Sequence, residues 1–253
     1  MALTVRDITL LGTGLGLGAI AYKLWTATAT ARRSSKKFKL IYHSKLGFRS
    51  APIQMLLLDA DAEFEMVDPH WGADRVIEKN PGMPSFAPPA LRDGDFTVAQ
   101  TPAILIYLGD QLGYGAGDDD WERAELLQLI LDIGDATSEL FTEVRKGPDE
   151  KAKFATAEEG GRLKNWLLHL RKVFYRRSNA QGFLFHAHRP TAADFFMLAT
   201  LESIDFSYGT EHISALMPTE FKAWRALMEA RPSYSAYKTQ AKPILFESMK
   251  FSG

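Results

Sequence analysis

Length and composition already exclude several classes of protein. The chain has 253 residues, of which 46% are hydrophobic and 24% charged, so there is material for two domains and global disorder is excluded. Thirty Lys and Arg against 31 Asp and Glu leave a net charge of −1. Nucleic acid is therefore not expected as a partner, because phosphate binding normally shows as a basic excess. The absence of cysteine excludes disulfides, thiolate metal sites and a cysteine nucleophile.

The first 37 residues differ from the rest of the chain. Ile8–Tyr22 contains no charged residue, and beyond Lys23 the apolar run continues to Ala27. A helix over residues 8–27 would have about the length of a bilayer core, roughly 30 Å. Basic residues follow at positions 32, 33, 36 and 37, so the positive-inside rule places the body of the protein in the cytosol. We interpret residues 1–37 as a membrane anchor or targeting segment.

Three other interpretations of this segment compete with the anchor. A cleaved targeting peptide fits the scarcity of acidic residues and would place the body inside an organelle. A helix packed on the body is disfavoured, since glycine weakens a helix in water by roughly 1 kcal/mol per residue. The pattern Gly14-x-Gly16-x-x-Ala19 imitates a dinucleotide fingerprint, but no acidic residue occurs between Asp7 and Asp59, where that fingerprint needs one. The cleaved peptide remains the main alternative.

Residues 38–113 have the pattern of a small α/β domain. Alternation and turn signals predict four strands, at Lys39–Tyr42, Phe64–Val67, Pro88–Leu91 and Phe96–Val98. Helical spacing of apolar residues predicts two helices, at Ser50–Ala62 and Thr101–Leu112. The order is β-α-β followed by β-β-α, with a proline opening the third strand.

Only helical patterns follow the glycine- and aspartate-rich linker at residues 114–120. The predicted helices are Trp121–Arg145, Ala157–Tyr175, Thr191–Phe206, Glu220–Glu229 and Ser233–Gln240. Residues 121–253 are therefore predicted to form an all-helical domain. No metal site is expected, because His186 and His188 do not lie on one face of a helix.

Four stretches of the sequence resemble one family. They are Lys39–Tyr42 with Gly47 after it, Pro88–Thr97 continued by Gln100–Leu108, Thr191–Phe195, and Phe221–Tyr237. Together residues 38–250 resemble the cytosolic glutathione transferases, and in detail the sigma-like branch that includes glutathione-dependent prostaglandin D synthases. The resemblance implies a thioredoxin-like N-terminal domain followed by an all-helical C-terminal domain. It also implies a homodimer that uses glutathione as co-substrate and needs no cofactor.

The resemblance makes Tyr42 the expected catalytic residue. A phenol at the end of a strand can donate a hydrogen bond to a thiol and favour the reactive thiolate. Glutathione brings its own sulfur, so the lack of protein cysteine agrees with a tyrosine mechanism. Without the resemblance, a half-buried core tyrosine would be the more usual interpretation.

The resemblance also implies a set of glutathione-binding residues. They are Phe48, Arg49, Trp71, Arg75, Ala87, Pro88, Gln100, Thr101 and Asp135. Gln100 and Thr101 precede a helix whose N-terminus suits the γ-glutamyl carboxylate, although an ordinary threonine cap is the alternative. Lys79 is an alternative to Arg75 for the glycyl carboxylate, and Asp135 is expected to reach glutathione across the dimer interface.

Two positions depart from the family pattern. Phe48 stands where the family has an arginine, with Arg49 next to it. Pro88 precedes Pro89, the expected cis-proline, and has no N–H for the backbone of glutathione. The leading hypothesis is an enzyme that transfers glutathione to small hydrophobic electrophiles. These two departures favour a weakly catalytic binding protein instead, and the predicted anchor favours a tethered structural or regulatory factor.

Overall fold

The computed structural model describes residues 37–43, 47–68, 87–117, 119–155, 161–177, 182–186, 188–216 and 219–240. The predicted anchor at residues 8–27 lies outside this part of the chain, as do Trp71, Arg75 and Lys79. Backbone proximity divides the chain into Met1–Lys36 and Lys37–Gly253. All described residues belong to the second unit, and none of their helices is both long and apolar enough to cross a membrane.

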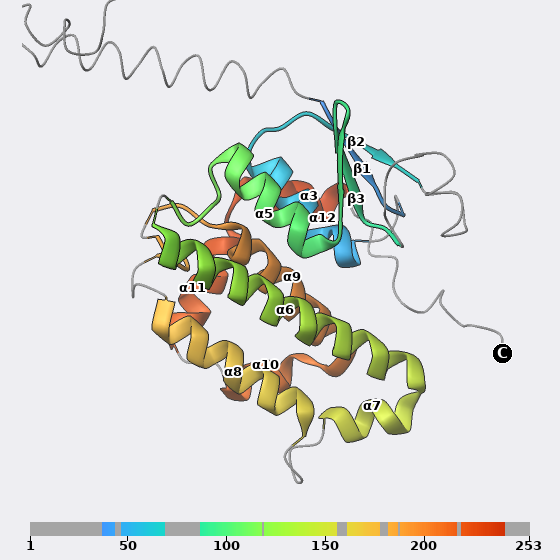
Figure 1. The fold of residues 1–253 in the computed structure, drawn as a ribbon. Helices are drawn as coiled ribbons and strands as arrows, with labels where there is room; N and C mark the ends of the chain where they lie inside the picture. Colours follow the sequence, from blue (N-terminus) through green and yellow to red (C-terminus); the bar gives the residue numbers. More distant parts are fainter. Residues whose placement is uncertain are drawn as a thin grey trace, which may run out of the picture. The chain divides into compact units, whose positions relative to one another are not determined.

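Four short strands form a mixed sheet in the first half of this unit (Figure 1). They are β1 (Phe38–Ile41), β2 (Phe64–Val67), β3 (Ala90–Asp93) and β4 (Phe96–Ala99), in the spatial order β2-β1-β3-β4. β2 runs parallel to β1, while β3 is antiparallel to both β1 and β4. Gly94, at φ +60°, makes the tight turn between β3 and β4. The predicted order of elements is confirmed.

Two helices accompany these strands and pack against each other. After a single 3-10 turn, η1 (Phe48–Ser50), the helix α3 (Ala51–Asp59) joins β1 to β2, and α5 (Thr101–Leu112) follows β4. α5 packs on β3 and β4 and against α3 (Figure 1). α3 is buried from Ala51 to Leu57, and α5 buries Ile104, Leu105 and Leu108 on one face, so the predicted α/β domain forms around one core.

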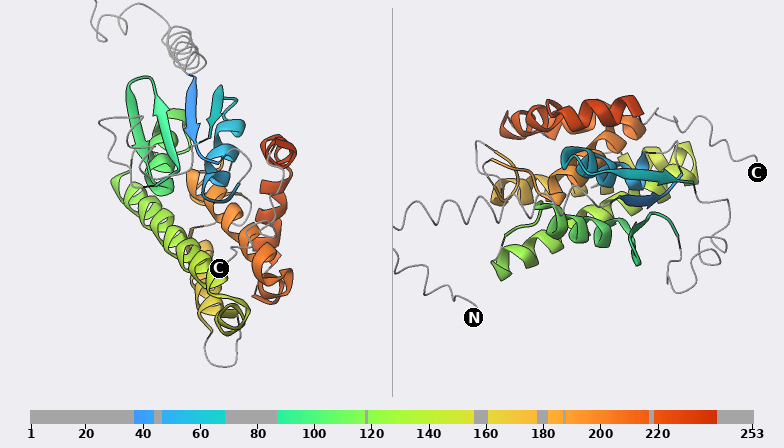
Figure 2. Two further views of the ribbon diagram at one scale, coloured as in Figure 1. Left: turned by 90° about the vertical axis from the view of Figure 1, so that its right-hand side faces the viewer. Right: turned by 90° about the horizontal axis from the view of Figure 1, so that it is seen from above.

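The second half of the unit is entirely helical. Its helices are α6 (Asp120–Lys146), α7 (Pro148–Ala155), α8 (Arg162–Arg177), α9 (Ala192–Tyr208), α10 (Thr210–Leu216), α11 (Thr219–Glu229) and α12 (Pro232–Gln240). α9 is central: it contacts α3, α5, α6, α10 and α11 and is buried over most of its length. Figure 2 shows it between α6 and the α11–α12 pair.

Two of these helices were not predicted. α7 and α10 start directly after Gly147 and Gly209, and each buries a single large apolar residue, Phe154 and Ile213. One buried position cannot produce the repeating apolar pattern by which helices are recognised in a sequence. The predicted helix Ala157–Tyr175 begins later, at Arg162, and residues 156–160 lie outside the described part.

The stretch Thr191–Phe195, which resembles the family, forms a capping box at the start of α9. Thr191 and Asp194 form it, and the Asp194 carboxylate is fully buried. Its Oδ2 accepts hydrogen bonds from the N–H and hydroxyl of Thr191 at 2.6 and 2.9 Å. Its Oδ1 accepts from the Leu184 N–H at 2.9 Å and from Trp224 Nε1 at 2.8 Å. Burial raises the pKa of Asp194 to about 6, against the opposing effect of these donors.

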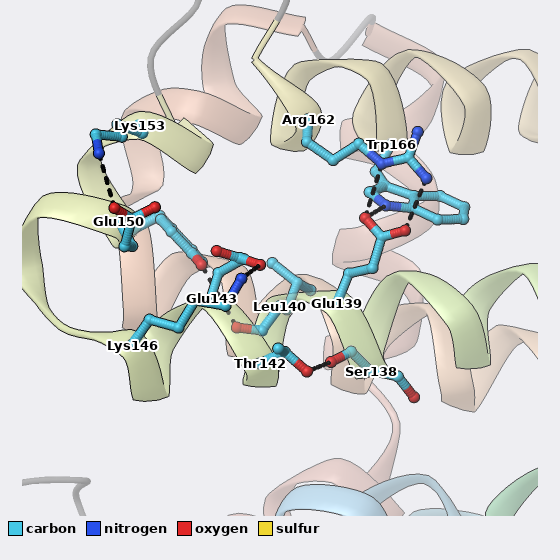
Figure 3. Close-up of polar contacts among 11 residues, drawn as sticks. Ser138, Glu139, Leu140, Thr142, Glu143, Lys146, Glu150, Lys153, Arg162 and Trp166 are labelled. Carbon is cyan, nitrogen blue, oxygen red and sulfur yellow. Dashed lines mark hydrogen bonds and ion pairs between the residues drawn. The ribbon is translucent and has the colours of Figure 1, made fainter.

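α6 and α8 are joined by a ladder of polar contacts. Three acidic residues of α6, seven positions apart, meet basic residues of α8, in the pairs Glu125 with Arg176 and Arg177, Asp132 with His169, and Glu139 with Arg162. Trp166 Nε1 also donates to Glu139 at 2.7 Å (Figure 3). Seven residues are two turns of helix, so the three carboxylates lie on one face of α6.

Candidate functional site

Tyr42 follows directly after β1, and its backbone N–H continues the pairing with β2 by donating to Val67 O at 3.1 Å. The side chain is buried, with 5% of its surface exposed. The backbone N–H of Arg49 is directed towards its hydroxyl. Burial raises the pKa of Tyr42, while that N–H and the charges of Arg49 and Arg145 oppose the rise. At neutral pH the phenol is therefore protonated and can donate a hydrogen bond.

The turn before α3 links Tyr42 to the start of α5. The N–H and hydroxyl of Ser50 both donate to Gly47 O, at 2.9 and 2.7 Å, which closes the turn. Arg49 lies inside it, and its carbonyl accepts a hydrogen bond from Thr101 Oγ1 at 2.9 Å. The N–H and C=O of Arg49 thus connect Tyr42 and Thr101, which come from opposite ends of the α/β domain.

The peptide bond between Pro88 and Pro89 is cis, as predicted. Ala87 and Pro88 are half-buried and lead into β3. The carbonyl of Pro89 accepts from the Gln100 N–H at 3.2 Å, so this segment is held beside the start of α5. Pro88 can offer only its carbonyl to a peptide ligand, because it has no N–H.

Gln100 and Thr101 open α5. Gln100 is exposed and has φ +73°, a conformation that residues with a Cβ rarely adopt. Thr101 is buried, and its hydroxyl proton is used in the bond to Arg49. An anion at this helix end would therefore receive its hydrogen bonds from backbone N–H groups, which the first turn of a helix leaves without intrahelical partners.

Phe48 packs between the two halves of the unit. Its φ is +42°, and its ring stacks on that of Phe141 in α6 with centroids 3.3 Å apart. The position where the family has an arginine is thus occupied by an apolar contact. The positive charges that act on Tyr42 come instead from Arg49 and from Arg145, one turn beyond Phe141 on α6.

Asp135 is exposed on α6. The preceding Gly134 lies close to the start of α5, since a Cβ there would be 3.4 Å from Pro102 Cγ. The structure contains one copy of the chain, so the expected contact across a dimer interface stays a prediction. In the described part of the chain, no group of three or more His, Cys, Asp or Glu side chains could hold a metal ion.

The structure therefore brings together Tyr42, Phe48, Arg49, Pro88 and Thr101, with Ala87 and Gln100 beside them. Sequence reasoning missed two residues at this site, Arg145 of α6 and Tyr237 of α12. Tyr237 lies against Gly47. Nothing in the sequence marks Arg145 without knowledge of which face of α6 meets the turn, whereas Tyr237 belongs to a motif that had been noted only for its fold.

No protein-family model matches the sequence. Among solved structures, the chain is similar to the Pi-class glutathione S-transferase of Onchocerca volvulus, with 22% identity and a TM-score of 0.67 over 81% of this chain and 95% of that one. It is also similar to the glutathione S-transferase of Ascaris lumbricoides, with 19% identity and a TM-score of 0.62 over 81% and 97%. For NaGST-2 the identity is 19% and the TM-score 0.57, over 81% and 96%. The chain thus has the fold of the glutathione S-transferases, a thioredoxin-like domain followed by an all-helical domain.

Proposed function

We propose that the chain is a glutathione transferase of the tyrosine type, with glutathione as co-substrate and no cofactor. The observation that supports this best is that Arg49 lies between Tyr42 and Thr101 on this fold: its N–H is directed towards the Tyr42 hydroxyl, and its carbonyl accepts from Thr101 Oγ1 at 2.9 Å. Tyr42 is the proposed catalytic residue. It is a buried phenol that is protonated at neutral pH and has one backbone N–H directed at its hydroxyl.

The proposed task of Tyr42 is to stabilise the glutathione thiolate. A free thiol with a pKa near 8.5 is mostly protonated at pH 7, and lowering that value by about 2 units takes roughly 2.7 kcal/mol. A hydrogen bond to a charged group supplies about 1.5–3 kcal/mol. The Arg49 N–H polarises the Tyr42 hydroxyl and so strengthens it as a donor. The positive charges of Arg49 and Arg145 also favour an anion beside the phenol.

The remaining glutathione contacts follow from the polarity of the surrounding groups. The start of α5, at Gln100 and Thr101, is proposed to bind the γ-glutamyl carboxylate, and the backbone of Ala87 and Pro88 the peptide. Trp71 and Arg75 are proposed at the glycyl carboxylate, and Asp135 at the γ-glutamyl group of the partner in a homodimer. Phe48, which is half-buried and stacks on the buried Phe141, is proposed to line the site of a small hydrophobic electrophile.

The proposed domain organisation is a membrane-anchoring segment at 1–37, a glutathione-binding domain at 38–113, a linker at 114–120 and a substrate-binding helical domain at 121–253. The sigma-like branch remains our proposed placement. The body is proposed to face the cytosol. Full-length tagged protein should then sediment with membranes and resist carbonate extraction. A processed N-terminus near Arg33 would support the cleaved peptide and an organelle interior instead.

The decisive experiment is binding to immobilised glutathione followed by a conjugation assay with a general electrophile. The proposal expects both retention and turnover. Retention without turnover would select a second candidate, a non-catalytic protein that binds glutathione or hydrophobic ligands. The contact between Phe48 and Phe141, made where the family has an arginine, favours that candidate. Neither retention nor turnover would select a tethered structural factor.

A further inference from the structure

Tyr237 of α12 lies against the turn that follows β1. Only 7% of its surface is exposed. A Cβ added at Gly47 would overlap the Tyr237 hydroxyl oxygen and lie 3.3 Å from Cζ. Gly47 itself has φ −66° and ψ −79°, values that other residues can adopt. A glycine is therefore needed at position 47 because Tyr237 fills the space that a side chain would take. The backbone conformation at this position does not require a glycine.

α12 is held in place on two sides, so Tyr237 cannot easily withdraw. At its start, the Arg231 guanidinium donates to the Asp59 carboxylate of α3 at 2.6 and 2.7 Å. Further along, the Tyr234 hydroxyl and Lys238 Nζ donate to Glu202 of α9 at 2.6 and 2.8 Å. Asp59 ends the helix that begins directly after the turn. The position of α12 is thereby tied to the element that carries the turn.

The turn in contact with Tyr237 also determines the hydrogen bond at Tyr42. Gly47 supplies the carbonyl that accepts from Ser50. Two residues after Gly47, the Arg49 N–H is directed towards the Tyr42 hydroxyl. A displacement of Gly47 would change the direction of that N–H. It would also affect the Arg49 carbonyl, to which Thr101 donates.

We propose that Tyr237 is a positioning residue for Tyr42, because its phenol packs on Gly47 and sets the turn that directs the Arg49 N–H at the Tyr42 hydroxyl. The inference rests on the proposed function, in which Tyr42 acts on the glutathione thiol. Burial, followed by the charges of Glu202 and of an ionised Tyr42, raises the pKa of Tyr237. The phenol therefore stays neutral over the working pH range and holds the turn without adding a charge.

The first test is Tyr237→Phe in the full-length chain, with conjugation of glutathione to a general electrophile measured against pH. Loss of the hydroxyl leaves a gap above Gly47 and loosens the turn. We expect the acidic limb of the kcat/KM profile, which reports the thiolate, to move up by about half a pH unit. The rate on that limb should therefore fall roughly threefold, with the affinity for glutathione unchanged.

Tyr234→Phe is the matched control, since its hydroxyl lies on the same helix but bonds to Glu202. In this variant α12 is still held by the bonds from Lys238 to Glu202 and from Arg231 to Asp59. Its profile should coincide with that of the unchanged chain. A profile for Tyr237→Phe that does not move would overturn the proposal. So would an equal movement in both variants, or a fall in rate at every pH without displacement of the limb, because either would indicate only a loosened α12.

The second test needs no substrate. Gly47→Ala should lower the midpoint of denaturant unfolding strongly when Tyr237 is present, and much less in a Gly47→Ala/Tyr237→Phe double variant, from which the overlapping oxygen is missing. Equal losses in the two backgrounds would refute the contact on which the proposal depends. If the unchanged chain neither binds glutathione nor conjugates it, the proposed function fails, while this cycle still decides whether Tyr237 sets the turn.

Discussion

The buried polar groups around Asp194 and around Tyr42 are organised in opposite ways. Asp194 lies in the core of the helical domain, and each of its oxygens accepts two hydrogen bonds, from Thr191, Leu184 and Trp224. Tyr42 lies where the two domains meet, and a single backbone N–H, that of Arg49, is directed towards its hydroxyl. A buried group whose hydrogen-bonding capacity is fully used stabilises the fold, whereas a group that still has a proton to donate can bind a ligand.

The largest effect on stability is expected from Asp194→Ala. The substitution leaves the N–H groups of Thr191 and Leu184 and the indole N–H of Trp224 buried without an acceptor. Each unsatisfied donor costs about 1–3 kcal/mol, so the free energy of unfolding should fall by at least about 3 kcal/mol. Denaturant unfolding followed by circular dichroism measures it. Asp149→Ala, at an exposed position of α7, is the control and should change stability by less than about 0.5 kcal/mol.

Tyr42→Phe should lower activity much more than stability. We expect conjugation to fall at least about tenfold, or roughly 1.4 kcal/mol or more in transition-state stabilisation. Glutathione affinity should stay almost intact, since the phenol acts on the thiolate and not on the peptide. The free energy of unfolding should fall less than in Asp194→Ala, because one backbone N–H and not three donors is left without an acceptor. Turnover equal to that of the unchanged chain would remove Tyr42 from its assigned role.

Thr101→Ala should affect both ligand binding and stability. Its hydroxyl donates to the Arg49 carbonyl, and it begins the helix proposed to bind the γ-glutamyl carboxylate. Without this bond the start of α5 is held less firmly, so we expect the glutathione dissociation constant to rise about tenfold and the free energy of unfolding to fall by about 1 kcal/mol. Calorimetric titration measures this. Thr101→Ser, which keeps the hydroxyl, should restore affinity, and Gln100→Ala should also weaken binding. Wild-type affinity in Thr101→Ala and Gln100→Ala would contradict the assignment.

Much of the fold could be predicted from the sequence because its signals are local. Phe64–Val67 and Thr101–Leu112 were predicted with the bounds that the structure has, and the capping box of Thr191 and Asp194 could be recognised from residues three apart. α7 and α10 could not, since each buries too little apolar surface to produce a pattern.

The same difference between local and long-range signals applies to the candidate site. Tyr42, Pro89 and the Gln100–Thr101 pair could be predicted because each belongs to a short motif. The contacts between site residues could not be predicted from local patterns: the bond from Thr101 to Arg49 joins residues 52 positions apart, and the stacking of Phe48 on Phe141 crosses between domains. Such contacts depend on how α6 and α12 pack against the α/β domain, and no local pattern specifies that packing.

The smallest effect is expected at Glu139, and it tests whether burial or the number of hydrogen bonds makes Asp194 important. Glu139 accepts three hydrogen bonds, two from Arg162 and one from Trp166, almost as many as Asp194, but it lies near the surface.

The bond from Arg162 lowers the pKa of Glu139 below its ordinary value of 4.5. Its stabilising contribution is therefore present above that value and is lost as the pH falls through the lowered pKa. Glu139→Gln should destabilise the chain by about 0.5–1 kcal/mol at pH 7, and the difference from the unchanged chain should shrink in unfolding measurements at progressively lower pH. A loss as large as that of Asp194→Ala would show that the number of hydrogen bonds, and not burial, separates the two carboxylates.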